Sequence, residues 1–192
     1  PGDELIYMVP NYLQIRGIAR NIGVNVIELP LQEELGWQWD INELEAIISD
    51  KTKMIAVCHP NNPTGSIVSK ENITQIIDIA SKNDCWILSD EVYRGAELNG
   101  LESPSFYGNY EKTIVSAGLS KAYRLPGLRL GWTIGPKYYI KKAWAFHDYT
   151  SISIAYHSDW IASKILDSKR RKIILDGTCL LYTSPSPRDT IR

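Results

Sequence analysis

Three residues near the middle of the chain have side chains suited to covalent and phosphate chemistry. Lys121 comes four residues after a β-prone run, 113–117, and Ser120 stands beside it. A lysine just past a strand end is placed to become a covalent amine at the carboxyl edge of a sheet, where α/β proteins bind ligands. Arg129 has the forked guanidinium that binds a phosphate. The same residues also fit an ordinary loop with a solvated lysine and arginine, so the rest of the chain must decide.

Further polar residues follow other β-prone runs. Asn62 lies in a stiff turn of asparagines and prolines whose amide groups face outward. Asp90 and Tyr93 follow a fourth run, and Tyr12 follows the first one. If these runs are parallel strands, their carboxyl ends share one edge and all four residues can converge on Lys121. Each of the four also has a structural interpretation, as a turn residue, a helix N-cap or a packed aromatic.

The elements that must position these residues follow from the apolar pattern. We expect strands at residues 5–9, 24–29, 53–58, 85–89, 113–117 and 128–134. We expect helices at residues 12–22, 40–48, 69–80, 137–150 and 155–175. Asp40 with Glu43 is typical of a capping box, and Ser69 of an N-cap. Strands that alternate with helices predict an α/β three-layer sandwich with a mostly parallel sheet.

Composition excludes several classes of protein. The chain has 192 residues, of which 44% are hydrophobic and 22% charged, as in ordinary globular domains. Its net charge of −1 gives no general attraction to nucleic acid or to anionic membranes. No apolar run approaches the ~20 residues of a spanning helix. Cys58, Cys85 and Cys179 have neither disulfide-framework nor metal-ligand spacing, which favours a reducing cytoplasm and no metal site.

Three motifs together give the sequence a specific resemblance. The runs Pro-Asn-Asn-Pro-Thr-Gly from Pro60, Asp-Glu-Val-Tyr from Asp90 and Ser-Lys-Ala-Tyr-Arg-Leu-Pro-Gly-Leu-Arg-Leu-Gly from Ser120 occur in this order. In order and spacing they resemble the large domain of class I/II aminotransferases, which are fold-type I enzymes that use pyridoxal 5′-phosphate. The resemblance covers residues 1–175. It implies small-molecule substrates, an amino acid and a 2-oxo acid.

The resemblance implies a role for each candidate residue. Lys121 would form the Schiff base with the cofactor and then act as the general acid/base. Asp90 would pair with the pyridine nitrogen and keep the ring an electron sink. Tyr93 and Asn62 would bind the phenolic oxygen of the cofactor. Arg129 and Ser120 would bind the phosphate, and Tyr12 would stack on the ring.

The sequence also departs from the family pattern. Gly118 stands where many relatives carry a serine or threonine that contacts the phosphate, so one hydrogen bond is expected to be lost or replaced by water. His59 stands where relatives usually have a smaller or amide residue. It either approaches the substrate or is a turn histidine with satisfied hydrogen bonds, and we favour the second. The resemblance also implies cis peptide bonds before Pro10 and Pro63.

The resemblance divides the chain into three parts. Residues 1–150 would be a partial cofactor-binding large domain, and residues 151–178 a helix leading toward a missing small domain. Residues 179–192 resemble a translated cloning adapter and are set apart from the fold. We therefore expect a fragment that is incomplete at both ends and inactive alone, cut from a homodimeric cytoplasmic enzyme.

Two other functions stay open on the sequence. A β-elimination lyase would use the same cofactor and the same residues around Lys121. A transcription regulator can carry this domain as a cofactor sensor behind a DNA-binding segment, although nothing in residues 1–178 is basic enough to suggest DNA contact. The amino acid that serves as substrate is not determined by these motifs.

Overall fold

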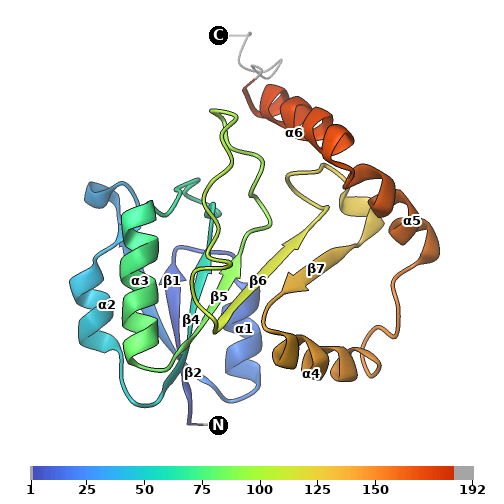
Figure 1. Ribbon diagram of the computed structural model, residues 1–192. Helices are drawn as coiled ribbons and strands as arrows, with labels where there is room; N and C mark the ends of the chain where they lie inside the picture. Colours follow the sequence, from blue (N-terminus) through green and yellow to red (C-terminus); the bar gives the residue numbers. More distant parts are fainter. Residues whose placement is uncertain (1, 184–192) are drawn as a thin grey trace.

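One mixed sheet organises the molecule (Figure 1). The computed structural model describes the backbone of residues 2–183 and the side chains of residues 2–178. Within that part, seven strands pair in the order β3-β2-β1-β4-β5-β6-β7. The strands are β1 (Glu4–Val9), β2 (Asn25–Gln32), β3 (Gln38–Trp39), β4 (Thr52–Cys58), β5 (Trp86–Asp90), β6 (Thr113–Gly118) and β7 (Gly131–Ile134). All pairs are parallel except β2 with β3 and β6 with β7.

Helices cover both faces of the sheet, which makes three layers (Figure 1). The α-helices are α1 (Gln14–Asn21), α2 (Ile41–Ile47), α3 (Lys70–Lys82), α4 (Lys137–His147), α5 (Tyr156–Ile165) and α6 (Ser168–Thr183). Ile6 and Met8 of β1 belong to the core cluster that contains residues of α2 and α3. Leu5 and Tyr7 belong to the cluster on the α1 side. Successive residues of β1 are therefore buried on opposite faces, as expected of a parallel strand covered on both sides.

Side-chain caps fix where two of these helices begin. The Ser69 hydroxyl accepts a hydrogen bond from the backbone N–H of Asn72 at 3.0 Å, as the sequence predicted. Asp40 caps α2, but its carboxylate accepts from the N–H of Asn42 at 2.8 Å, one position before Glu43. Both caps satisfy backbone N–H groups that have no partner within the first turn of a helix.

The sequence prediction was wrong for the helices after residue 155. We expected one helix over residues 155–175, and the structure has α5 and α6. The carboxylate of Asp167 accepts hydrogen bonds from the N–H groups of Lys169 at 3.2 Å and Arg170 at 3.4 Å. An aspartate in this place starts a new helix, as an N-cap does. The expected end at residue 175 is also wrong, because α6 continues to Thr183.

The structure between β6 and β7 differs from the strand expected at residues 128–134. The strand expected from residue 128 begins at Gly131, because a 3-10 turn, η2 (Pro126–Leu128), precedes it. Arg129 then takes a left-handed backbone with φ 48°. The chain reverses there, so β7 runs antiparallel to β6. The short edge strand β3 and the 3-10 turn η1 (Glu33–Leu35) were not expected from the sequence.

Residues 184–192 of the expected adapter tail lie outside the described residues, and residues 179–183 extend α6. The division into a large-domain part and a following helix stays a prediction. No helix within residues 2–183 has both the length and the apolar character needed to cross a membrane.

Gly118 of β6 lies opposite Gly131 of β7, and the lack of side chains there lets the two strands approach closely. A substitution at Gly131 tests this packing. A Cβ atom at Gly131 would lie 2.9 Å from the backbone oxygen of Ala117, whereas a Cβ at Gly17 in α1 would meet nothing within 4 Å. We expect Gly131→Ala to lower the free energy of unfolding by roughly 1–3 kcal/mol, as overpacking does. Gly17→Ala should raise it by up to about 1 kcal/mol. Urea denaturation measures both, and equal effects at the two sites would contradict the packing described here.

Candidate active site

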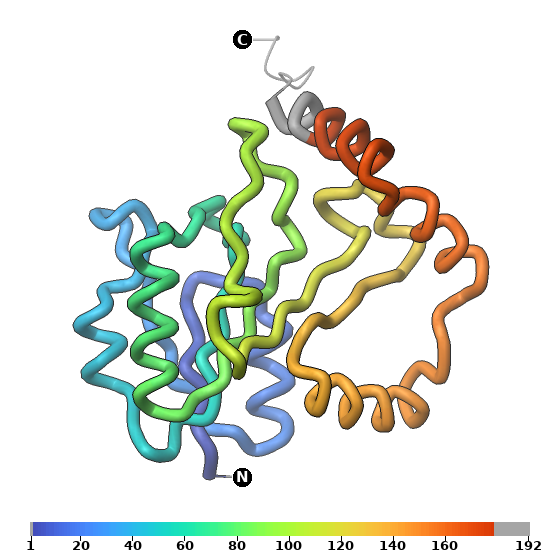
Figure 2. Tube along the Cα trace, in the orientation of Figure 1, coloured from blue at the N-terminus to red at the C-terminus, as the bar shows by residue number. Residues whose placement is uncertain are grey.

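The carboxyl ends of β1, β4, β5 and β6 lie at one edge of the sheet, and a cavity opens there. The loop after β5 and the loop between β6 and β7 rise from this same edge (Figure 2). The cavity has a volume of about 540 Å³. All seven residues singled out in the sequence line it: Tyr12, Asn62, Asp90, Tyr93, Ser120, Lys121 and Arg129. The structure thus brings together every candidate residue, although their roles stay predictions.

Lys121 lies in the loop that follows β6, and its side chain is exposed to the cavity. Two backbone hydrogen bonds close this loop, from Leu119 N–H to the Leu130 carbonyl at 3.0 Å and from Leu125 N–H to the Leu119 carbonyl at 2.9 Å. The Lys121 Nζ atom lies 5.7 Å from the centroid of the Tyr93 ring. This is the distance range of a cation–π contact, so the amine and the phenol face the same space.

Asp90 ends β5 and supplies a carboxylate to the cavity. Its Oδ1 atom accepts hydrogen bonds from the Val92 N–H at 3.2 Å and from the Ser116 hydroxyl at 3.3 Å. Ser116 is opposite Asp90 in the β5–β6 register, so sheet pairing itself creates the second bond. Burial raises the pKa of Asp90 above its ordinary value, and these two hydrogen bonds offset part of that rise. A cation beside this carboxylate would favour its charged form.

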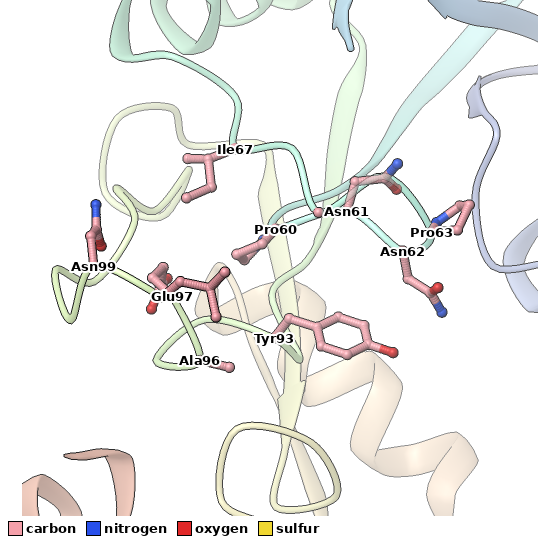
Figure 3. Close-up of a pocket in the computed structure, with 11 residues that line it drawn as sticks. Pro60, Asn61, Asn62, Pro63, Ile67, Tyr93, Ala96, Glu97 and Asn99 are labelled. Atoms are coloured by element: carbon pink, nitrogen blue, oxygen red, sulfur yellow. The ribbon is translucent and has the colours of Figure 1, made fainter. Parts of the chain in front are cut away.

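Asn62 and Tyr93 lie between two cavities that adjoin each other. Both residues also line a second pocket of about 500 Å³, and in Figure 3 their side chains extend to the same side of it. Asn62 is in the turn after β4, and the peptide bond to Pro63 is cis, as is the Val9–Pro10 bond. Both cis bonds implied by the resemblance are therefore confirmed. The structure adds a third one, between His59 and Pro60.

Arg129 and Ser120 flank Lys121 at the mouth of the cavity. The Arg129 Nη1 atom donates to the Pro126 carbonyl at 2.9 Å, which anchors one end of an exposed guanidinium. A guanidinium has five N–H donors, so this bond leaves donors that can bind an anion. Ser120 is half-buried and adds a hydroxyl beside them. The pair forms a cationic and hydrogen-bonding rim suited to a phosphate.

The backbone of Tyr12 is held by Tyr7, which the sequence analysis did not single out. The Tyr12 ring is 59% exposed, which fits a side chain that covers an open cavity rather than one packed in the core. Its carbonyl accepts a hydrogen bond from the hydroxyl of Tyr7, which is fully buried in β1. Burial raises the pKa of Tyr7 to about 12, so this hydroxyl remains a donor at neutral pH. The apolar pattern of β1 predicts that Tyr7 is buried, but nothing in the sequence indicated that its hydroxyl would donate to the Tyr12 carbonyl.

His59 and Gly118, the two departures from the family pattern, have structural explanations. His59 is fully buried, and both ring nitrogens have backbone partners, so the favoured interpretation as a satisfied turn histidine is confirmed. Gly118 pairs with Gly131 across β6 and β7. A Cβ atom at Gly118 would lie 3.1 Å from the Leu130 oxygen, so a side chain there would push the two strands apart.

The geometry of the cavity suits pyridoxal 5′-phosphate. A carboxylate, an amine and a guanidinium lie on different strand ends around one space, and the partly buried carboxylate of Asp90 is the group that a cationic ring nitrogen would stabilise. Among the described residues, no cluster of three or more histidine, cysteine, aspartate or glutamate side chains could hold a metal ion. The fold and the lysine-bearing cavity define the large domain of a fold-type I enzyme.

Comparison with known proteins identifies the family. Residues 1–174 match the model for aminotransferase class I and II, and the chain belongs to this family. It is 30% identical over 172 residues to aromatic-amino-acid aminotransferase 2 of Thermococcus litoralis, covering 88% of this chain and 44% of that protein. It is 33% identical over 145 residues to an aspartate aminotransferase of Musicola paradisiaca, covering 74% of this chain and 36% of that protein.

Solved structures agree with this assignment. A PLP-dependent aminotransferase from Streptococcus suis superposes with a TM-score of 0.85 and 35% identity, over 92% of this chain and 46% of that one. Aspartate aminotransferase from Thermus thermophilus with maleate gives a TM-score of 0.89 and 27% identity, over 95% of this chain and 48% of that one. The predicted fold is confirmed, and the chain spans less than half the length of these relatives.

The raised pKa of Asp90 predicts that this site costs stability when no ligand is bound. Above that pKa the folded protein holds a partly buried charge, so Asp90→Asn, which keeps a side-chain oxygen that can accept both hydrogen bonds, should raise the free energy of unfolding at pH 7. The gain should shrink as the pH falls through the pKa of Asp90, because the native carboxyl is then neutral.

Urea denaturation of the ligand-free chain between pH 3.5 and 8 would measure this difference. Asp78→Asn is the matched control, because Asp78 is exposed on α3, and it should change stability by less than about 0.5 kcal/mol at every pH. A loss of stability in Asp90→Asn at pH 7 would contradict the desolvation argument.

Proposed function

We propose that this chain is the central part of an enzyme that moves an amino group between an amino acid and a 2-oxo acid, with pyridoxal 5′-phosphate as cofactor. The observation that carries the proposal is the placement of Lys121, Asp90 and Arg129 around one cavity, from the end of β5 and from the loop between β6 and β7. Membership of the aminotransferase family supports it. Relatives named as aspartate, aromatic-amino-acid and kynurenine–oxoglutarate aminotransferases favour amino-group transfer over elimination or cofactor sensing.

The cofactor supplies an aldehyde that bonds covalently to amines and a ring that withdraws electrons from the attached carbon. Asp90 then has a clear task, because a carboxylate at the inner wall of the cavity can hold a proton on the ring nitrogen. Substitution of this charge by a neutral amide should slow turnover by orders of magnitude. The same substitution stabilises the ligand-free fold, so function and stability oppose each other at this position.

Lys121 would do the proton chemistry. Its amine would hold the cofactor and, when free, would take a proton from the substrate α-carbon and return one. The closed loop from Leu119 to Leu130 limits how far the amine can move. The centroid of the Tyr93 ring is 5.7 Å from the amine nitrogen, so both groups lie on the same side of the cavity.

The remaining residues would hold the cofactor in place. Arg129 and Ser120 would bind its phosphate at the mouth of the cavity, where the Arg129 side chain is already anchored to Pro126. Tyr12 would cover the ring, and Asn62 and Tyr93 would bind the phenolic oxygen. These interactions would orient the reactive carbon toward Lys121, so that positioning assists the proton transfer.

The visible absorbance of bound cofactor tests the role of Lys121. In the full-length protein loaded with pyridoxal 5′-phosphate, Lys121→Ala should abolish the absorbance that depends on the covalent bond, and activity with it. Lys82→Ala, which removes an exposed lysine from α3, should leave both unchanged. Retention of the absorbance by the Lys121→Ala variant would rule out this lysine as the attachment site.

We also propose that the full-length protein is a homodimer that works in the cytoplasm. Six large apolar side chains on α4, α5 and the intervening loop are exposed, and we name this group the aromatic face: Trp144, Phe146, Tyr149, Ile152, Tyr156 and Trp160. Each is more than half exposed, and Tyr149 is 87% exposed. A group of exposed aromatic side chains is typical of a surface that becomes the buried centre of an interface between subunits. Cys58 and Cys85, both free and buried, fit a reducing compartment.

Sedimentation of the full-length protein at micromolar concentration tests the dimer. We expect twice the mass of one chain, and we expect Phe146→Ser with Tyr156→Ser to reduce it to one chain. Ile22→Ser, at the end of α1, removes a side chain that is 64% exposed but lies outside the aromatic face, and should leave the dimer intact. A double variant that remains fully dimeric would show that this face is not the interface.

A further inference from the structure

The buried ring of His59 connects two loops behind the cavity. Its Nδ1 atom accepts a hydrogen bond from the Val68 N–H at 2.9 Å, and its Nε2 atom lies 2.7 Å from the Pro104 carbonyl. Since Nδ1 accepts, the hydrogen must be on Nε2, which donates to Pro104. The side chain is fully buried and does not line the cavity, so it cannot contact a substrate. Burial lowers the pKa of His59, which keeps this neutral form at physiological pH.

The first of these bonds closes the turn that carries Asn62. The turn leaves β4 at His59 and returns at Val68. Inside it, the Asn61 amide donates to the Pro10 carbonyl at 3.1 Å and to the Thr64 hydroxyl at 2.9 Å. Figure 3 shows Asn61 and Asn62 on this turn. The internal bonds fix the shape of the turn, and the bond from Val68 to His59 fixes where its far end lies relative to β4.

The second bond joins this turn to the support of Asp90. Pro104 is followed by Ser105 and Phe106, and the Ser105 hydroxyl and Phe106 N–H donate to the buried carboxylate of Glu91 at 2.8 and 3.1 Å. Glu91 directly follows Asp90. One short segment, residues 104–106, is therefore attached to the ends of both β4 and β5. The edge of the Phe106 ring also packs on His59, with 5.9 Å between the ring centroids.

We propose that His59 is a positioning residue that acts through Asn62. The bond that its ring accepts from Val68 sets the place of the Asn62 turn relative to β4, and so relative to the cofactor. This inference rests on the proposed function, in which Asn62 binds the phenolic oxygen of pyridoxal 5′-phosphate. The charged groups that act on His59 are Glu97 and Arg94, on the loop that follows Tyr93. Neither displaces the ring from its two backbone partners.

Two conservative substitutions separate the two bonds. In His59→Asn, the side-chain oxygen can take the place of Nδ1 and accept from Val68, while the bond to Pro104 is lost. In His59→Gln, the side-chain nitrogen can take the place of Nε2 and donate to Pro104, while the bond from Val68 is lost. Both replacements are neutral and polar. If His59 acts through the turn, only the second substitution should disturb Asn62.

Spectrophotometric pH titration of the full-length protein loaded with pyridoxal 5′-phosphate provides the first measurement. Asn62→Ala should shift the pH midpoint of the visible absorbance, because it removes a donor from the phenolic oxygen. His59→Gln should shift it in the same direction by about 0.5–1 pH unit. His59→Asn should leave it within about 0.2 pH unit of the unmodified protein. The double variant of His59→Gln and Asn62→Ala should shift no further than Asn62→Ala alone.

Amide hydrogen exchange of the same proteins without cofactor provides the second measurement. The Val68 N–H should lose at least about tenfold protection in His59→Gln and keep it in His59→Asn. This measurement also shows whether each variant is folded, through the protection of amides in β1 and β4.

The outcomes are distinguishable. Equal midpoint shifts in the two His59 variants, or none in either while Asn62→Ala shifts, would overturn the positioning role. Unmodified protein without any visible absorbance would instead contradict the proposed function. In that case, retained Val68 protection in His59→Gln would overturn the account of the turn, and its selective loss would support it.

Discussion

Parallel pairing of β1, β4, β5 and β6 is the constraint on which the rest of the structure depends. Because these strands run in one direction, everything that follows their carboxyl ends meets at one edge of the sheet. The register is as important as the direction. Cys58 lies opposite Asp90, and Asp90 lies opposite Ser116, so the pairing places a hydroxyl on the carboxylate. A slip of one residue would turn each of these side chains to the other face of the sheet.

Buried polar side chains lie next to the residues that line the cavity and hold parts of their backbone. Tyr7 holds the backbone of Tyr12, Glu91 stands next to Asp90, and His59 closes the turn of Asn62. Burial of such groups is costly unless each is hydrogen-bonded, and the three have partners that satisfy them. Bonds to a charged group such as Glu91 contribute about 1.5–3 kcal/mol each. Three buried and hydrogen-bonded polar groups therefore lie next to the residues of the site.

The residues that line the cavity could be predicted from the sequence because they carry their signal locally. Six of the seven candidate residues follow a β-prone run, and the parallel sheet converts that position into proximity. Arg129 is the exception, because it was expected inside the strand 128–134 and lies just before β7. The supporting residues could not be predicted in this way. His59 reaches Pro104, which is 45 residues away in the sequence. Tyr7 reaches the carbonyl of Tyr12, only five residues on, but the sequence pattern does not show how the turn between them runs. The break between α5 and α6 was missed for a local reason. The apolar pattern continues across it, and only the capping carboxylate of Asp167 marks the new start.

The central claim is that the cofactor is held covalently by Lys121, and mass spectrometry tests it most directly. The full-length protein is loaded with pyridoxal 5′-phosphate, reduced with borohydride, digested and mapped. The account predicts that the added mass is confined to the peptide that contains Lys121. Stoichiometric labelling of another lysine, or a fully loaded protein in which Lys121 is unlabelled, would contradict it.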